Sequence, residues 1–139
     1  MKAREVRGLD PGAALLPNGA RIIETRLAEL LAFAGPALDP AAAQAQHDLR
    51  IAAKRLRYVL ELIGPCFGPE AEAARKAAKE LQGVLGEIHD CDVMLPSAAG
   101  VESLLVLLRT RRELLFRRFR ELWLAQSKGG TWLALERSL

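Results

Sequence analysis

The sequence is poor in the residues that build β-sheets and disulfide frameworks. Aromatic residues make up 5% of its 139 residues, and Val, Ile and Thr are sparse, which argues against a sheet. The chain has two cysteines, Cys66 and Cys91, which lack the spacing of a metal site. About 25 residues of predicted helix would hold their sulfurs roughly 30 Å apart or more, which is beyond the reach of a disulfide. We therefore expect free thiols in a reducing compartment.

Long hydrophobic runs and targeting segments are also missing. Apolar stretches such as Leu104–Leu108 are far shorter than the roughly 18 residues of a membrane span. The first residues, Met1–Arg7, are charged and lack the apolar core and cleavage site of a signal peptide. We expect no membrane partner and a cytoplasmic location.

Motifs that indicate enzymatic chemistry are absent as well. The sequence contains no Gly-rich phosphate loop, no serine elbow and no paired carboxylates on a common helix face. It predicts a protein that is not an enzyme and that requires no cofactor.

The sequence does contain a strong helical pattern. Half of the residues are hydrophobic, mainly Ala and Leu, which favour helices. Apolar stripes of helical period between Gly and Pro breaks predict helices at about residues 21–34, 40–63, 70–95 and 101–125, and a short one at 131–139. We expect an all-α fold, an antiparallel four-helix bundle with a short C-terminal helix. This domain covers residues 20–139 and follows an N-terminal arm, residues 1–19, that is partly ordered at best.

Several residues are expected at helix ends and in the core. Gly35-Pro36 should end the first helix, and Asp39 should cap the second, with Pro40 at its first position. Thr131 should cap the last helix. In the 101–125 helix, the residues expected to face inward are Leu104, Leu108, Leu115, Phe119 and Leu122.

The 40–63 helix carries a row of cations opposite an apolar stripe. At about 100° per residue, one arc of roughly 80° holds His47, Arg50, Lys54, Arg57 and Glu61. Leu49, Ala53 and Leu56 fall on the opposite side, which is predicted to be buried. Cations placed one turn apart in this way are seldom needed for the stability of a helix alone.

The short connection at residues 64–69 predicts that this helix and the 70–95 helix form an antiparallel hairpin. Residues whose numbers sum to about 136 should then be neighbours, which pairs His47 with His89, Arg50 with Gly86, Lys54 with Gly83, Arg57 with Lys79, and Glu61 with Arg75. Cations gather along this seam with few acids, and they repel one another unless an anion lies between them. Each glycine costs about 1 kcal/mol against alanine but leaves room for a ligand. The pattern predicts a site for a polyanion.

The residues alone leave other interpretations open. Charged helical faces are often only solvated surface. Although residues 109–120 hold six Arg and one Glu, we prefer that interpretation for Arg109, Arg112 and Arg117 on the residues alone. His47, His89 and Asp90 could bind zinc, as in a metal-dependent phosphohydrolase, but the nearby cations oppose a metal ion and we expect none. A nucleic-acid or protein interaction module is the third alternative, although few aromatic residues are available to stack on bases.

Two segments resemble motifs of the CHAD family, the conserved-histidine α-helical domains. His47–Arg57 is similar to the family's first motif, and Leu81–Val93 is similar to its second. The resemblance covers roughly residues 20–139 and also includes the Arg-rich 101–125 helix. It implies a module that binds inorganic polyphosphate in a basic channel and that occurs on polyphosphate granules. Carried onto this chain, the polyphosphate-binding residues are His47, Arg50, Lys54, Arg57, Lys76, Lys79, His89 and Arg112.

The sequence departs from the family pattern in three ways. Lys54 and His89 stand where Arg is common, which weakens bidentate phosphate contacts. No triphosphatase-like domain is attached. The family has two four-helix halves related by pseudo-symmetry, and this chain has one. We therefore expect a symmetric homodimer that rebuilds the channel.

Overall fold

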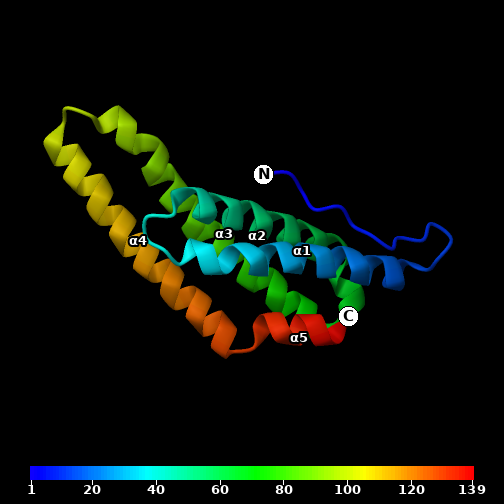
Figure 1. Ribbon diagram of the computed structural model, residues 1–139. Coiled ribbons are helices and arrows are strands. Elements are labelled where there is room, and N and C mark those ends of the chain that lie inside the picture. Colours follow the sequence, from blue (N-terminus) through cyan, green and yellow to red (C-terminus); the bar gives the residue numbers. More distant parts are fainter.

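The computed structural model describes residues 1–139 and contains helices only. Figure 1 shows the α-helices, which are α1 (Leu15–Ala37), α2 (Ala43–Ile63), α3 (Pro69–Met94), α4 (Glu102–Lys128) and α5 (Thr131–Ser138). Short 3-10 turns follow α2 and α3, at Gly64–Phe67 and Leu95–Ala98. The predicted all-α class and the short C-terminal helix are confirmed. None of these helices combines the length and the apolar character that a membrane crossing requires.

The helices form a chain of neighbours rather than a closed bundle. α1 packs on α2, α2 on α3 and α3 on α4, while α5 folds back onto α3 and touches α4 and α1. Figure 1 shows α4 running obliquely past α1, with the end of α3 and the start of α4 projecting beyond the other helices. The antiparallel four-helix bundle is therefore not confirmed. α5 and the second half of α4 together close the core against α3.

The core lies where α1, α2, α3, the second half of α4 and α5 meet. The α2 residues predicted to be buried, Leu49, Ala53 and Leu56, are fully buried, and α5 contributes Trp132 and Leu135. Burial of each large apolar side chain contributes roughly 1.5–3 kcal/mol. α3 supplies small residues that let its neighbours approach closely, namely Ala71, Ala74, Ala77 and Ala78.

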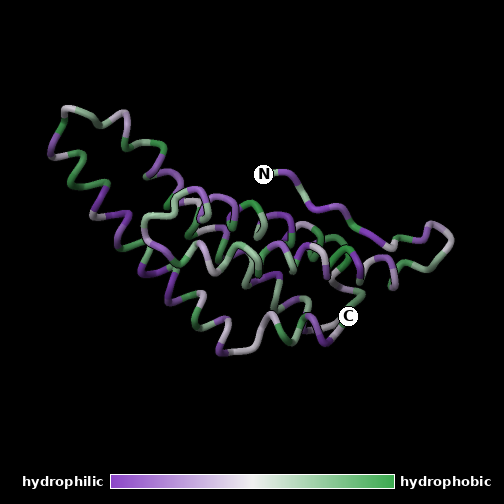
Figure 2. The backbone as a smooth tube through the Cα atoms, in the orientation of Figure 1, coloured by the Kyte–Doolittle hydropathy of each residue, from purple (hydrophilic) through white to green (hydrophobic).

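The first half of α4 leaves apolar side chains in solvent. Leu104, expected in the core, is 36% exposed, and Leu107 is 62% exposed. Burial begins at Leu108, and only Phe119 is fully buried. Figure 2 shows the apolar, green stretches along this projecting hairpin. The expectation for Leu104 was wrong because only the end of α3 and the following 3-10 turn lie beside these turns. One face of α4 therefore has nothing to pack on.

α1 is longer at both ends than predicted. It begins at Leu15 and continues through Gly35 and Pro36 to Ala37, so the Gly-Pro pair does not end it at residue 34. A proline in the last turn removes a single backbone hydrogen bond. Pro36 also lies on the exposed side of the helix, where water can satisfy the carbonyl that loses its partner.

Two expected caps were also wrong. α2 begins at Ala43, three residues later than predicted, because the Asp39 carboxylate accepts a hydrogen bond from the Ala41 N–H (3.0 Å) and forms a turn instead of a cap. α5 is preceded by Gly130, whose φ of 69° lies in the left-handed region that glycine adopts freely. Thr131 is already the first helical residue and makes no cap.

The N-terminal arm is attached to the helices through one buried carboxylate. Glu29 is 1% exposed, and it accepts hydrogen bonds from the Arg4 N–H (3.0 Å), from Arg26 and from Arg55 (3.3 Å). The arginines also donate to the arm's carbonyls, Arg26 to that of Arg4 (3.2 Å) and Arg55 to that of Met1 (2.6 Å). The ion pairs of Glu29 with Arg26 and with Arg55 thus compensate the buried carboxylate, and the same arginines hold the arm.

Candidate functional site

The antiparallel register of α2 and α3 is confirmed at both ends of the predicted seam. At one end the rings of His47 and His89 stack, with centroids 4.3 Å apart and planes inclined by 22°. At the other end Arg75 Nη1 lies 4.0 Å from Glu61 Oε1. The short 3-10 turn between the helices fixes this register, because its length leaves α3 little freedom to slide along α2.

A hollow of about 460 Å³ opens between these two ends, and we call it the seam hollow. It has no apolar lining residue. Its walls are formed by Arg50, Arg57, Lys79, Gln82, Gly83, Gly86, Glu87 and Asp90. Three of these side chains are cationic and two are acidic, so the lining carries a net charge of +1 (3 − 2).

The two glycines give the seam hollow its depth. A methyl group added at Gly83 would meet no atom within 4 Å, and one added at Gly86 would meet only Arg50 Nε, at 3.9 Å. Alanine would therefore fit at either position without a clash. The packing of α2 on α3 does not require glycine here, and the missing side chains leave open space beside the cations, as the sequence predicted.

The three cations of the seam hollow differ in how firmly they are held. Arg57 donates to Glu61 Oε1 (2.9 Å) and to Gln82 Oε1 (2.8 Å), which fixes its guanidinium. Arg50 and Lys79 form no ion pair with any carboxylate. Their charges are therefore available to an anion that enters the hollow.

Five of the eight predicted binding residues do not line the seam hollow. Two of them are the lysines Lys54 and Lys76. Lys54 is exposed, and its Nζ lies 5.9 Å from the centre of the Tyr58 ring. Lys76 is exposed on α3, forms no ion pair and does not line the hollow. Both flank the seam as mobile ammonium groups, which can approach a long anion but do not shape its site.

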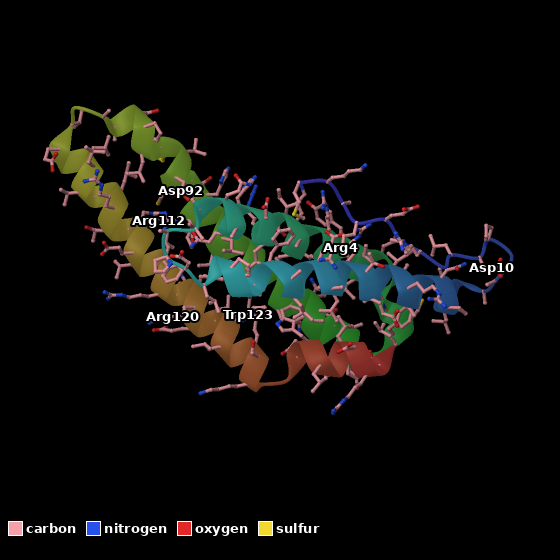
Figure 3. The ribbon with its side chains drawn as sticks, in the orientation of Figure 1. Arg4, Asp10, Asp92, Arg112, Arg120 and Trp123 are labelled. Atoms are coloured by element: carbon pink, nitrogen blue, oxygen red, sulfur yellow. The ribbon has the colours of Figure 1, made fainter.

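Arg112 is placed apart from the seam. Its guanidinium donates to Asp92 Oδ1 (2.5 Å) and Oδ2 (3.2 Å), to Gln46 Oε1 (2.7 Å) and to the Pro40 carbonyl (2.9 Å). Figure 3 shows Arg112 and Asp92 next to each other on α4 and α3. Asp92 of α3 thus accepts two hydrogen bonds from an arginine of a neighbouring helix. Arg112 therefore joins α4 to α2, α3 and the α1–α2 loop.

His47 contributes less charge than the sequence suggested. Nδ1 of His47 is hidden from solvent and has no hydrogen-bond partner. Burial, followed by the neighbouring His89 and Arg50, lowers the pKa of His47 below its ordinary value of 6.5. His47 is therefore mostly neutral at pH 7, because burial and like charges both disfavour the imidazolium. The cationic row along α2 effectively starts at Arg50.

Sequence reasoning missed Gln82 and Glu87. Both follow from the helical period, because Gln82 is one turn after Lys79 and Glu87 is one turn after Gly83. Glu87 lines the seam hollow together with Asp90 and lies 3.4 Å from Arg111 of α4. Glu87 and Asp90 therefore lie toward the histidine end of the seam, where Arg50 lines the same hollow, and Lys79 lies toward its other end.

No group of three or more His, Cys, Asp or Glu side chains lies close enough together to hold a metal ion. The zinc set considered from the sequence, His47, His89 and Asp90, does not form such a group. Cys66 is exposed, Cys91 is buried, and both are free thiols.

Comparison with known families matches the CHAD domain over residues 9–99. The match spans both segments that resemble the family's motifs, starts earlier than the predicted residue 20, and ends before α4. It therefore includes every lining residue of the seam hollow and excludes Arg112. Searches of curated proteins and of solved structures found no match. Since the match covers more than half of the sequence, the chain belongs to the CHAD family.

Proposed function

We propose that this protein binds inorganic polyphosphate, without catalysis, through the seam between α2 and α3. The observation that carries the proposal is the seam hollow itself. Arg50, Arg57 and Lys79 line one concavity without apolar residues, and two of them have no carboxylate partner. Membership of the CHAD family is consistent with a polyphosphate-related role.

The proposed mechanism is electrostatic. Arg50 and Arg57 lie two turns apart on one face of α2, about 10.5 Å along its axis, and Lys79 faces them from α3. A phosphate chain lying along the seam would meet cations from both helices. Arg can grip phosphate oxygens in a bidentate manner, and Lys acts as a point charge. By analogy with nucleic acids, neutralised phosphates release condensed cations, so the affinity should fall steeply with salt.

The charges along the seam also suggest where the chain would lie. Glu87 and Asp90 would repel phosphate near the histidine end. The free charges of Arg50 and Lys79 attract phosphate at the middle and toward the Glu61 end, where the exposed Lys76 and Lys54 could reach an extended chain. We therefore assign the main contacts to Arg50, Arg57 and Lys79, with His47 and His89 at the margin.

A bare phosphate chain fits this lining better than a nucleic acid does. Single-stranded nucleic acids gain about 1–3 kcal/mol per base from stacking on aromatic side chains. The seam hollow has no aromatic lining residue, and Tyr58 on its flank already lies beside Arg57 and Lys54. The lining therefore offers attraction for phosphates and little for bases.

The test compares Arg50→Gln and Lys79→Gln with the parent in equilibrium binding to long-chain polyphosphate over a series of salt concentrations. Each substitution should weaken binding and reduce the slope of log K against log salt by about one. Arg137→Gln, an exposed arginine of α5 far along the chain, removes the same charge and should leave the slope unchanged. If both seam variants bound polyphosphate like the parent, the seam would not be the site. If the parent hydrolysed tripolyphosphate, the protein would be a phosphohydrolase rather than a binding protein.

We further propose that the protein acts as a homodimer in the cytoplasm, at polyphosphate granules. Exposed apolar side chains on the projecting hairpin support an assembly, among them Val93, Met94, Val106, Leu107 and Leu114, because contiguous apolar surface is characteristic of interaction sites. Light scattering at micromolar concentration with polyphosphate present should report a dimer. A monomer under these conditions would contradict the homodimer but would leave the proposal of polyphosphate binding in the seam unchanged.

A further inference from the structure

A second concavity lies where α4 passes the α1–α2 loop, and we call it the α4 groove. It has a volume of about 500 Å³ and shares no lining residue with the seam hollow. Arg109, Arg112, Arg117 and Arg120 of α4 surround it, and Pro40 of the loop forms part of its wall. Volumes of this size are typical of small-molecule sites. Figure 3 shows Arg112 and Arg120 along this helix.

One wall of the α4 groove is rigid. The hydrogen bonds of Arg112 to Asp92, Gln46 and the Pro40 carbonyl hold the loop against α4. The loop is further fixed by the hydrogen bond from the Ala41 N–H to the Asp39 carboxylate. A ligand would therefore find this wall preformed, which lowers the entropy cost of binding.

The other three arginines bring unbalanced charge to the groove. Arg109, Arg117 and Arg120 form no ion pair, and neither does Glu113, the single acid in the lining. Arg117 and Arg120 are three residues apart, a spacing at which like charges destabilise a helix. An anion between the guanidinium groups would remove this repulsion and accept charge-assisted hydrogen bonds.

The α4 groove also has an apolar part, which the seam hollow lacks. Phe116 lines the groove with a small exposed area, 6% of its surface, and packs on Phe119, with ring centroids 6.0 Å apart. Pro40 and Ala41 also line the groove. Guanidinium planes can in addition stack on flat aromatic groups. The lining therefore suits an anion that carries a flat, partly apolar group.

We propose that the α4 groove binds a nucleoside triphosphate. Arg109, Arg117 and Arg120 contact its phosphates, and the base lies over the apolar surface of Phe116 and Pro40. The proposal is independent of polyphosphate binding in the seam, because the two sites share no residue.

The experiment measures ATP binding to the full chain by calorimetry in magnesium-free buffer. The double variant Arg117→Gln/Arg120→Gln should bind ATP about tenfold more weakly or worse, since charged hydrogen bonds contribute about 1.5–3 kcal/mol each. A matched control is Arg111→Gln/Arg118→Gln, which removes the same charge from the same helix outside the groove. This control should bind ATP like the parent.

Tripolyphosphate and adenosine separate the contributions of phosphate and base. ATP should bind at least about fivefold more tightly than tripolyphosphate, because stacking of a base is worth about 1–3 kcal/mol, and adenosine should not bind measurably. Equal affinity of the parent and the Arg117→Gln/Arg120→Gln variant for ATP would overturn the proposal. Equal affinity of the parent for ATP and tripolyphosphate would overturn it as well. Neither result would affect the seam, which the salt series with polyphosphate tests separately.

Discussion

The substitution Arg112→Gln should destabilise the protein without weakening polyphosphate binding. The guanidinium makes hydrogen bonds to Asp92, Gln46 and the Pro40 carbonyl, and the side chains of Arg112 and Asp92 are 15% and 23% exposed. Removing one partner of a buried ion pair costs about 3–5 kcal/mol. Because both side chains retain some contact with water, we expect about 2–4 kcal/mol and a Tm lower by roughly 6–15 °C.

Urea and thermal unfolding followed by far-UV circular dichroism measure this loss. Arg117→Gln, which removes an exposed charge five residues away on the same helix, is the matched control and should stay within about 0.5 kcal/mol of the parent. A double-mutant cycle with Asp92→Asn should give a coupling of about 1 kcal/mol or more. The opposite result would be an Arg112→Gln variant with parental stability and weakened polyphosphate binding. It would show that Arg112 binds polyphosphate, as the family resemblance implies, and that it does not mainly hold α4 in place.

Three further predictions follow from the seam and the arm. Gly83→Ala should stabilise the protein by about 1 kcal/mol in thermal unfolding, because the added methyl meets no atom within 4 Å; a loss of stability would contradict the open geometry. Unfolding free energy should rise between about pH 5 and pH 7, because the unfolded chain binds more protons while the pKa of His47 is lowered in the folded state. His47→Gln should flatten this rise in unfolding free energy. An unchanged pH profile in the variant would contradict the lowered pKa of His47 as its cause. Glu29→Gln should destabilise the fold by about 2–4 kcal/mol and speed tryptic cleavage after Arg4, whereas Glu24→Gln on the exposed side of α1 should change neither.

The seam could be predicted from the sequence because local features determine it. The helical period of α2 and α3 separates their faces, and the short turn between them sets the register that pairs His47 with His89 and Arg50 with Gly86. These statements need only the geometry of two helices and one connection. The charges of Arg50 and Lys79 remain unpaired because no other element covers this face.

The position of α4 could not be predicted in the same way. Its apolar residues are spread around the helix, so the sequence does not define a single apolar stripe. Packing against the other helices therefore decides which face is buried, and Leu104 is not on that face. The decisive contacts link Arg112 to residues 20 to 72 positions away in the chain. Asp39 was misplaced for a related reason, because a cap and a turn use the same carboxylate and differ only in the path of the following residues.

The attachment of the N-terminal arm has a consequence for how freely its sequence can change. The contacts that hold it use its backbone: the amide and the carbonyl of Arg4 and the carbonyl of Met1. Recognition at Met1 and Arg4 therefore does not depend on their side chains, as in the addition of a strand to a sheet edge. Nearly any residue can stand at position 4 as long as it keeps its N–H, which proline alone lacks. The helices would fix the path of the arm's backbone, whereas the amino acids on its outward surface could vary.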